Sequence, residues 1–112
     1  MKKFLALVLA MLMVFSLCAC GDGGDSSGEK VVKIGVFEPI TGQNGAGGKQ
    51  EVLGMQYANA QNPTVEIGGE TYKVELVYSD NGSDSAKAVS AASKLVNEKV
   101  SLVLGSYGSG VS

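Results

Sequence analysis

The 112-residue chain contains no histidine, and all nine of its basic residues are lysines. Without histidine it lacks the side chain that most often acts as a metal ligand or as a general base near neutral pH. Without arginine, and with a formal net charge of −2, it lacks the basic patch that binds nucleic acid. Carboxylates are not paired at a convincing catalytic spacing either. We therefore expect no catalytic residue, no metal, no cofactor and no nucleic-acid partner.

Cysteine is also scarce, and both cysteines lie within the first twenty residues. Cys18 and Cys20 are separated by one residue, which makes a disulfide bond between them sterically poor. The surrounding stretch, MKKFLALVLAMLMVFSLCAC, has the layout of a secretory signal. Lys2 and Lys3 precede an apolar core that is too short to span a bilayer comfortably. We expect residues 1–19 to be a signal peptide that is removed.

The last four residues of that stretch, LCAC, resemble the bacterial lipobox, in which a cysteine is acylated before the signal is cleaved. Cys20 fits the acylated position because the small Ala19 precedes it, whereas Cys18 follows the bulky Leu17. A plain signal with two incidental cysteines is the alternative. The resemblance to bacterial lipoproteins implies a diacylglycerol on Cys20, and hence a lipid anchor at the extracytoplasmic face of the cell membrane.

Residues 20–29 are rich in glycine, serine and aspartate, a composition that behaves as flexible coil. We interpret them as a tether between the lipid and a folded part at residues 30–112. Removal of residues 1–19 takes away two lysines, so seven lysines remain against eleven acidic residues and the net charge becomes −4. The mature chain is therefore expected to be acidic.

From residue 30 onward, predicted strands alternate with predicted helices. Short, largely apolar and β-branched runs predict strands at residues 31–37, 72–78 and 100–105. Gly68 and Gly69 lie between TVEI and ETYKVELVY and favour a tight turn, so we expect a short hairpin before the second of these strands. This order predicts an α/β fold with a parallel, Rossmann-like βαβ sheet and right-handed crossovers.

Two helices are predicted between the strands. Residues 84–99 repeat apolar positions at helical spacing, with Ser83 or Asp84 as the N-cap. The expected apolar stripe of this helix comprises Ala88, Val89, Ala92, Leu95 and Val96. Residues 49–61 form a less regular helix with two alternative stripes, one of Val52, Met55 and Asn59 and the other of Leu53, Tyr57 and Ala60.

Ligands of open α/β sheets bind outside the carboxyl ends of the strands, where the βα turns gather. The turn after the first strand, EPITGQNGAGGKQ, fails the phosphate-binding pattern, because Gln43 replaces its glycine and Gln50 its serine or threonine. After the third strand the spacing of Gly105, Gly108 and Gly110 fails the dinucleotide pattern. These failures argue against a nucleotide cofactor and against an enzyme of the Rossmann type.

The turn after the third strand, GSYGSGVS, suits a carboxylate better. Gly108, Ser109 and Gly110 are predicted to enter a helix whose body lies beyond Ser112, and a helix start presents free N–H groups and partial positive charge to an anion. The Ser109 hydroxyl adds a donor, and the glycines let a ligand approach the backbone. The alternative is that these residues only make a turn and cap a helix.

The chain also resembles a family. KIGVFEPITGQNGAGGKQEVLGMQYA, followed by YKVELVYSDNGSDSAKAVSAASKLVNEKVSLVLGSYGSG, is similar to the start of the extracytoplasmic solute-binding proteins of branched-chain amino-acid ABC transporters. The specific parts are the IGVxxPxTG opening, Asp80 with AVxAAxKLVN after it, and the GxxxSG turn. The resemblance covers residues 33–112. It implies a type I periplasmic-binding fold, in which two α/β lobes close on an amino acid and present it to a membrane permease.

Carried over by position, the resemblance implies that Ser109 holds the α-carboxylate of the ligand and that Gly108 and Gly110 shape the loop. Tyr107 flanks the pocket, as wall or as core. Gly47 lies where some leucine-binding relatives place an aromatic residue over the ligand side chain, so its lack of a side chain puts specificity for branched-chain amino acids in doubt.

Two alternatives stay open. Asp80 is either a site residue or a turn aspartate before a helix. The leading function is a lipid-anchored substrate-binding component of an ABC transporter for branched-chain or related amino acids, and the alternative is a sensor of amino acids or amides that acts in signalling. Family members run to several hundred residues, so we expect residues 30–112 to be the N-terminal part of a truncated ligand-binding domain.

Overall fold

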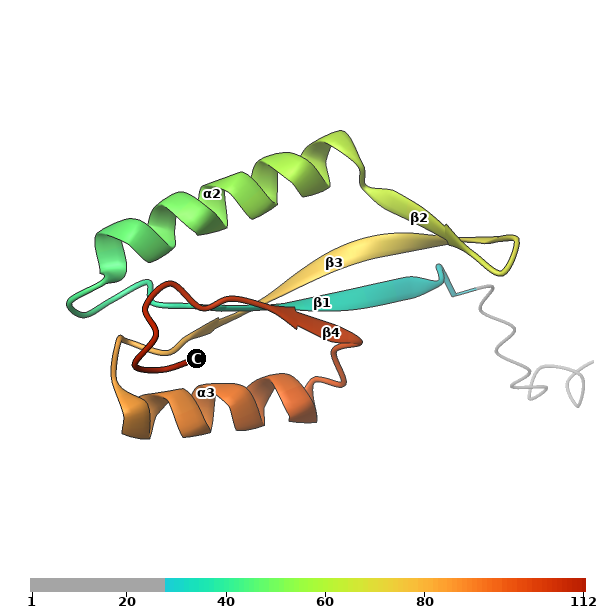
Figure 1. Ribbon diagram of the computed structural model, residues 1–112. Helices are drawn as coiled ribbons and strands as arrows, with labels where there is room; N and C mark the ends of the chain where they lie inside the picture. Colours follow the sequence, from blue (N-terminus) through green and yellow to red (C-terminus); the bar gives the residue numbers. More distant parts are fainter. Residues whose placement is uncertain (1–27) are drawn as a thin grey trace, which may run out of the picture.

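The computed structural model describes residues 28–112. The predicted signal peptide, Cys20 and most of the tether lie outside the described residues. The described part forms a four-stranded sheet with two helices (Figure 1). In chain order the elements are β1 (Val31–Glu38), α2 (Gly45–Gln61), β2 (Thr64–Ile67), β3 (Glu70–Asp80), α3 (Ser85–Asn97) and β4 (Leu102–Leu104).

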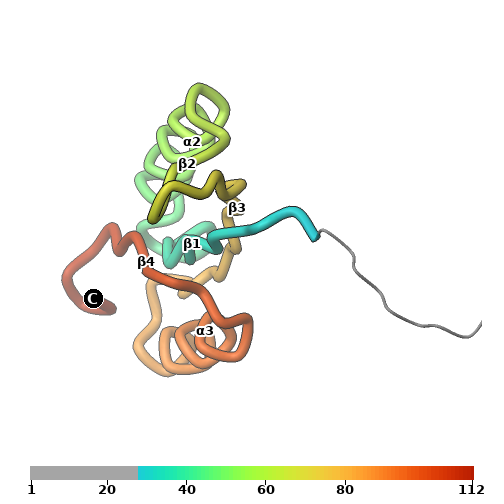
Figure 2. Tube along the Cα trace, turned by 90° about the vertical axis from the view of Figure 1, so that its right-hand side faces the viewer, coloured from blue at the N-terminus to red at the C-terminus, as the bar shows by residue number. Residues whose placement is uncertain are grey.

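The strand order in the sheet is β2-β3-β1-β4. β1 lies at the centre and pairs in parallel with both β3 and β4, as the alternation of strands and helices predicts. β2 pairs antiparallel with β3 through the turn at Gly68 and Gly69, which confirms the predicted hairpin. α2 and α3 cover opposite faces of the sheet (Figure 2). The expected α/β class and parallel βαβ core are therefore confirmed, with one antiparallel edge strand.

The contact between α3 and β1 depends on a glycine. A Cβ atom at Gly35 would lie 3.1 Å from Leu95 Cδ1 and 3.2 Å from a methyl group of Val103. The absence of a side chain at this position lets Leu95 reach the middle of the central strand, where it is almost fully buried. The hydroxyl of Ser79 in β3 donates to the Ala91 carbonyl at 2.9 Å and adds a buried polar link to α3.

The buried side of α3 differs in part from the predicted stripe. Ala88, Ala91 and Leu95 are buried, whereas Val89 and Val96 are 68% and 73% exposed. Ala92 is exposed as well. The helix presents small residues to the sheet because close packing against Gly35 leaves room for only one large side chain, that of Leu95. Asp84 is the N-cap, and its Oδ1 accepts the N–H of Lys87 at 2.8 Å.

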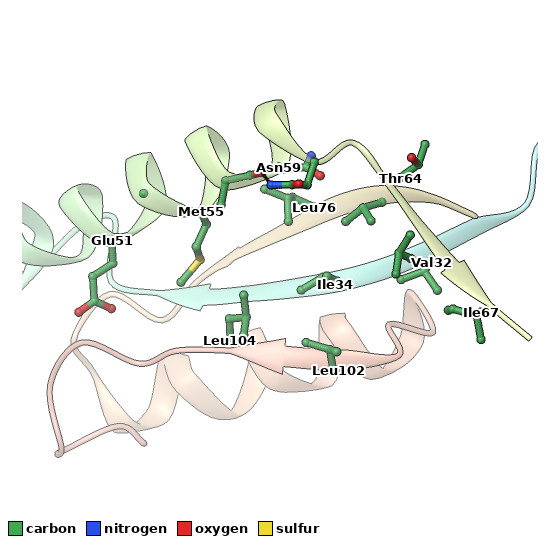
Figure 3. Close-up of a pocket in the computed structure, with 15 residues that line it drawn as sticks. Val32, Ile34, Glu51, Met55, Asn59, Thr64, Ile67, Leu76, Leu102 and Leu104 are labelled. Carbon is green, nitrogen blue, oxygen red and sulfur yellow. Dashed lines mark hydrogen bonds between the residues drawn. The ribbon is translucent and has the colours of Figure 1, made fainter. Parts of the chain in front are cut away.

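The first of the two alternative stripes of α2 faces the sheet. Val52, Met55 and Asn59 are half-buried, whereas Leu53 and Tyr57 are 60% and 70% exposed. Together with the apolar side chains of the sheet, α2 encloses an open groove of about 960 Å³ (Figure 3). The sheet residues that line this groove include Val32, Ile34, Val74, Leu76, Leu102 and Leu104.

β4 is an exposed edge strand of the described sheet. It pairs only with β1, and its three residues Leu102, Val103 and Leu104 are all more than a third exposed. A second apolar groove, of about 500 Å³, lies between α3 and the sheet beside this strand. Both faces of the sheet are therefore incompletely covered at β4.

Within residues 28–112, no helix is long and apolar enough to cross a membrane.

Candidate functional site at the carboxyl edge of the sheet

The connecting segments gather at the carboxyl edge of the three parallel strands, where the sequence places the site. Glu38 at the end of β1 pairs in register with Asp80 at the end of β3, and Val36 pairs with Leu104 at the end of β4. Residues 39–44, 81–84 and 105–112 therefore leave the sheet at the same edge (Figure 1). The first two segments lead into helices, and the third carries the predicted ligand-binding residues.

Asp80 ties the first two segments together. Its Oδ1 accepts the N–H groups of Ile40 and Gly82, each at 2.8 Å. Its Oδ2 accepts the Thr41 hydroxyl at 2.6 Å and the Lys87 ammonium at 3.0 Å. Burial acts to raise the pKa of Asp80, but these hydrogen bonds outweigh it and hold the pKa well below its ordinary value. With both oxygens engaged, the geometry favours the turn aspartate over a ligand-binding residue.

Asn81 joins the second segment to the third, a role that the sequence did not suggest. It is fully buried. Its Nδ2 donates to the Ser106 hydroxyl at 2.8 Å, and its Oδ1 accepts the Ser83 N–H at 3.1 Å. Its own N–H donates to the Glu38 carbonyl at 3.2 Å. The loop after β4 is therefore held against the end of β3 by a side chain that has its own hydrogen bonds satisfied.

Glu38 is the second residue that sequence reasoning missed. It lies at the end of an apolar strand and is fully buried. Its Oε2 accepts the N–H of Tyr107 at 2.8 Å, whereas its Oε1 has no hydrogen-bond partner among the described residues. A charged residue that follows an apolar strand and precedes Pro39 is the signal that could have drawn attention to it.

The predicted carboxylate-binding residues lie on the exposed side of the third segment. Ser109 and Gly110 are exposed, and Gly108 is half-buried with a φ of 103°, a backbone conformation that favours glycine. A Cβ atom at Gly108 would also lie 2.6 Å from Asn44 Nδ2. Val111 N–H donates to the Gly108 carbonyl at 3.3 Å, which closes a turn. The prediction that a helix begins here stays a prediction, because its body was expected beyond Ser112.

This turn leaves a group of donors free. Among the described residues, no hydrogen bond uses the N–H group of Gly108, Ser109 or Gly110, and none uses the Ser109 hydroxyl. These groups belong to consecutive residues at the carboxyl edge of a parallel sheet. Such a run of unused donors can bind an anion without first breaking hydrogen bonds within the protein.

Tyr107 lies beside the first turn of α2. A Cβ atom at Gly47 would collide with the Tyr107 ring, so the ring occupies the space directly over this glycine. The side chain is 44% exposed, which leaves part of it open to solvent. Tyr107 therefore has both expected features: part of its ring packs on the start of α2, and the rest forms exposed surface at the edge of the sheet.

The large groove under α2 does not coincide with the candidate site at the carboxyl edge of the sheet. It runs along the face of the sheet. Glu51 is its charged lining residue and lies at the end of the groove toward the candidate site (Figure 3). The rest of its lining is mainly apolar and does not include residues 105–110.

The described residues also contain no group of three or more acidic, cysteine or histidine side chains that could hold a metal ion.

Comparison with known proteins identifies the family. A family model described as periplasmic binding protein matches residues 31–112. The chain belongs to the periplasmic binding protein family. This is a family of ligand-binding proteins rather than of enzymes, in agreement with the expected lack of catalysis, and the α/β sheet described above matches part of its fold.

Individual relatives agree on the type of protein. A Leu/Ile/Val-binding protein homologue of Brucella abortus is 36% identical over 97 residues, which are 86% of this chain and 25% of the relative. A leucine-binding protein, LivK, of Thermotoga maritima aligns with 38% identity and a TM-score of 0.65 over 72% of this chain and 22% of its own. LivJ of Streptococcus pneumoniae, a branched-chain amino-acid transporter substrate-binding protein solved with isoleucine, aligns with 34% identity and a TM-score of 0.62 over 73% of this chain and 24% of its own. The chain thus spans about a quarter of the length of the curated relatives that it matches.

Proposed function

We propose that this chain supplies the first-lobe part of a substrate-binding protein that takes branched-chain or related amino acids from outside the cell and passes them to an ABC transporter permease. The observation that carries the proposal is the run of unused donors at residues 108–110, at the carboxyl edge of the sheet. The similarity to LivK and to the isoleucine-bound LivJ supports it.

In this proposal the α-carboxylate of the ligand lies on the turn at residues 108–110. The unused backbone N–H groups of Gly108, Ser109 and Gly110 would donate to this carboxylate, and the Ser109 hydroxyl would add a further hydrogen bond. Hydrogen bonds to a charged acceptor are stronger than those between neutral groups. Lys87 at this edge is engaged by Asp80 and Thr41, and the proposal assigns the recognition to backbone and hydroxyl donors.

The side chain of the ligand packs on Tyr107 in the same proposal. The open part of the tyrosine surface adjoins the turn that carries Ser109, and Gly47 gives the ring its position. An apolar amino-acid side chain on this surface would be partly removed from water, which stabilises the complex through the hydrophobic effect. An aromatic surface at residue 107 also compensates for the missing side chain at residue 47.

The cellular setting is also part of the proposal. Cleavage after residue 19 and acylation of Cys20 would anchor the protein outside the cell membrane, with residues 20–29 as the tether and residues 30–112 as the first part of the binding domain. The family of extracellular and periplasmic binding proteins supports a location outside the cytoplasm. A permease in the same membrane is then within reach of the tethered domain.

The first test is the substitution Ser109→Ala in the full product of the gene. Removal of one charge-assisted hydrogen bond is expected to weaken binding by about 1–2 kcal/mol, which corresponds to roughly a 5- to 30-fold rise in Kd. Isothermal titration calorimetry with leucine, isoleucine and valine measures this. Ser93→Ala is the matched control, because among residues 28–112 the hydroxyl of the exposed Ser93 bonds only to the Val89 carbonyl of the preceding turn of α3.

The outcomes separate the parts of the proposal. An unchanged Kd for Ser109→Ala removes Ser109 from the site. Absence of binding by the unmodified protein to any of the three amino acids contradicts the proposed ligand class.

A further inference from the structure

We propose that Glu38 is a positioning residue for the ligand-binding turn: one of its carboxyl oxygens holds the backbone of Tyr107, while the carboxyl group shares a proton with Glu51. The inference rests on the proposed function, because the turn that it positions is the one proposed to bind the ligand carboxylate. Glu38 is not one of the groups proposed to touch the ligand. It acts on residues 108–110 only through its hydrogen bond with Tyr107.

The first step of the argument is the place of Glu38 between the sheet and the loop. Its side chain is fully buried, and its Oε2 accepts the Tyr107 N–H at 2.8 Å. Gly105 passes so close that a Cβ atom there would lie 2.9 Å from Glu38 Oε1. Tyr107 immediately precedes the three residues with unused N–H groups. The hydrogen bond from Tyr107 to the Glu38 carboxyl therefore fixes the position of the backbone immediately before this turn.

The second step concerns the proton. The Oε1 atom of Glu38 is buried and finds no donor among residues 28–112. The carboxyl group of Glu51 extends from α2 toward the same edge of the sheet (Figure 3), and interaction with Glu51 acts to raise the pKa of Glu38. Two carboxylates have only acceptor atoms, so a hydrogen bond between them requires that one carries a proton. Such a proton supplies the donor that the buried Oε1 of Glu38 otherwise lacks.

The electrostatic surroundings act in the same direction. Burial raises the pKa of Glu38, and Glu51 raises it further, while the hydrogen bond from the Tyr107 N–H acts to lower it. The register partner from β3, Asp80, is itself neutralised by Lys87 and by loop donors. Asn81 at the end of β3 and the backbone of Tyr107 bring no charge. The net effect is a pKa of Glu38 above the ordinary value of glutamate, which favours its neutral form.

A neutral Glu38 suits the proposed ligand. The turn at residues 108–110 follows directly after Tyr107, so an ionised Glu38 would place a buried negative charge beside a bound carboxylate and repel it. Loss of the shared proton would also abolish the hydrogen bond that we propose between Glu38 and Glu51. The affinity for a carboxylate ligand should therefore fall as the pH rises through the pKa of Glu38.

The experiment compares three variants of the full gene product, with leucine, isoleucine or valine as the titrated probe between pH 5 and pH 8. Glu38→Gln keeps an acceptor for Tyr107, adds a donor for Glu51 and cannot ionise. Glu38→Leu removes the acceptor and leaves the Tyr107 N–H unsatisfied, which should weaken binding about tenfold. Glu66→Gln, an exposed glutamate of β2, is the control for the loss of a charge.

The expected result has two parts. Glu38→Gln should recover most of the affinity that Glu38→Leu loses, and it should bind with a flatter pH profile than the unmodified protein. A Glu38→Gln variant as weak as Glu38→Leu at every pH, or a pH profile identical to that of the unmodified protein, overturns the inference.

A second measurement needs no ligand and separates this inference from the proposed function. The Tyr107 amide proton should be protected from exchange in the unmodified protein and in Glu38→Gln, but not in Glu38→Leu, and the carboxyl carbon of Glu38 should titrate above the ordinary range of glutamate in NMR. If no amino acid binds and these signals appear, the proposed function fails while the positioning role of Glu38 stands. A Tyr107 amide that exchanges equally in all three proteins overturns the positioning role.

Discussion

At the scale of single residues, two carboxyl groups at paired positions of neighbouring strands have opposite properties. Glu38 and Asp80 face each other in the register of β1 and β3, yet the pKa of Glu38 is raised and that of Asp80 is lowered. Asp80 receives several hydrogen-bond donors and one ammonium group, whereas Glu38 receives a single N–H and has an acidic neighbour. The number of donors, rather than the residue type, decides in which direction the pKa of each carboxyl moves.

The role of Asp80 leads to a prediction about stability. Asp80→Asn removes the charge that the Lys87 ammonium and the loop donors bind, and it should lower the free energy of unfolding by about 2 kcal/mol. Urea denaturation followed by circular dichroism measures the change. Glu66→Gln serves as the control for an exposed acid and should lie within about 0.5 kcal/mol of the unmodified protein. A loss for Asp80→Asn no larger than that of the control would contradict the structural role.

The same residue predicts how stability depends on acid. Because folding lowers the pKa of Asp80, its contribution is fully present above the ordinary value of 3.8 and is lost as the pH falls below that value toward the folded pKa. The difference in unfolding free energy between the unmodified protein and Asp80→Asn should therefore shrink as the pH is lowered below about 4. Denaturation series at several acidic pH values test this sign.

At the scale of elements, glycines position both helices: Gly35 of β1 makes room for Leu95 of α3, and glycines of α2 lie close to backbone. α2 begins at Gly45 rather than at Lys49, and its buried residues are Gly45 and Gly48. A Cβ atom at Gly48 would collide with the Pro39 carbonyl, so the start of the helix packs directly on the segment after β1. Glycine disfavours helices locally, and this tertiary contact outweighs that preference.

The orientation of α3 gives a second prediction. Leu95→Ala removes the one large side chain that the helix buries against β1 and should cost about 2–5 kcal/mol of unfolding free energy. Val96→Ala is its neighbour and the matched control, and it should change stability little because Val96 is 73% exposed. Chemical denaturation of both variants compares the two sides of the helix directly. Equal losses would mean that the predicted apolar stripe, rather than the observed one, faces the core.

At the scale of the whole molecule, both edge strands of the described sheet are exposed, β2 on one side and β4 on the other. The two apolar grooves of about 960 and 500 Å³ both adjoin β4, on opposite faces. The proposed ligand-binding turn leaves the sheet from the same strand. The loop is nevertheless held, because Glu38, Asn81 and Ser106 connect it to the central strands.

The proposed anchoring also belongs to this scale. Cys20→Ser should release the protein from the membrane, since it removes the site of the lipid chains that hold it there. Fractionation of cells into membrane and soluble parts measures the release, and incorporation of labelled fatty acid measures acylation directly. Cys18→Ser is the matched control and should stay with the membrane. If Cys20→Ser still pellets with the membranes, the lipobox interpretation is wrong.

The sequence by itself determined the order of strands and helices, the hairpin and the edge of the sheet where the loops gather, because these depend on local periodicity, on turn residues and on the topology of parallel strands. It could not tell which of two stripes of α2 is buried, or that Val89 and Val96 stay exposed, because both follow from contacts with other elements. The burial of Glu38 and the hydrogen bonds of Asn81 were likewise decided by tertiary structure. They depend on Tyr107 and Ser106, which are distant in sequence and meet these residues only when β4 pairs with β1.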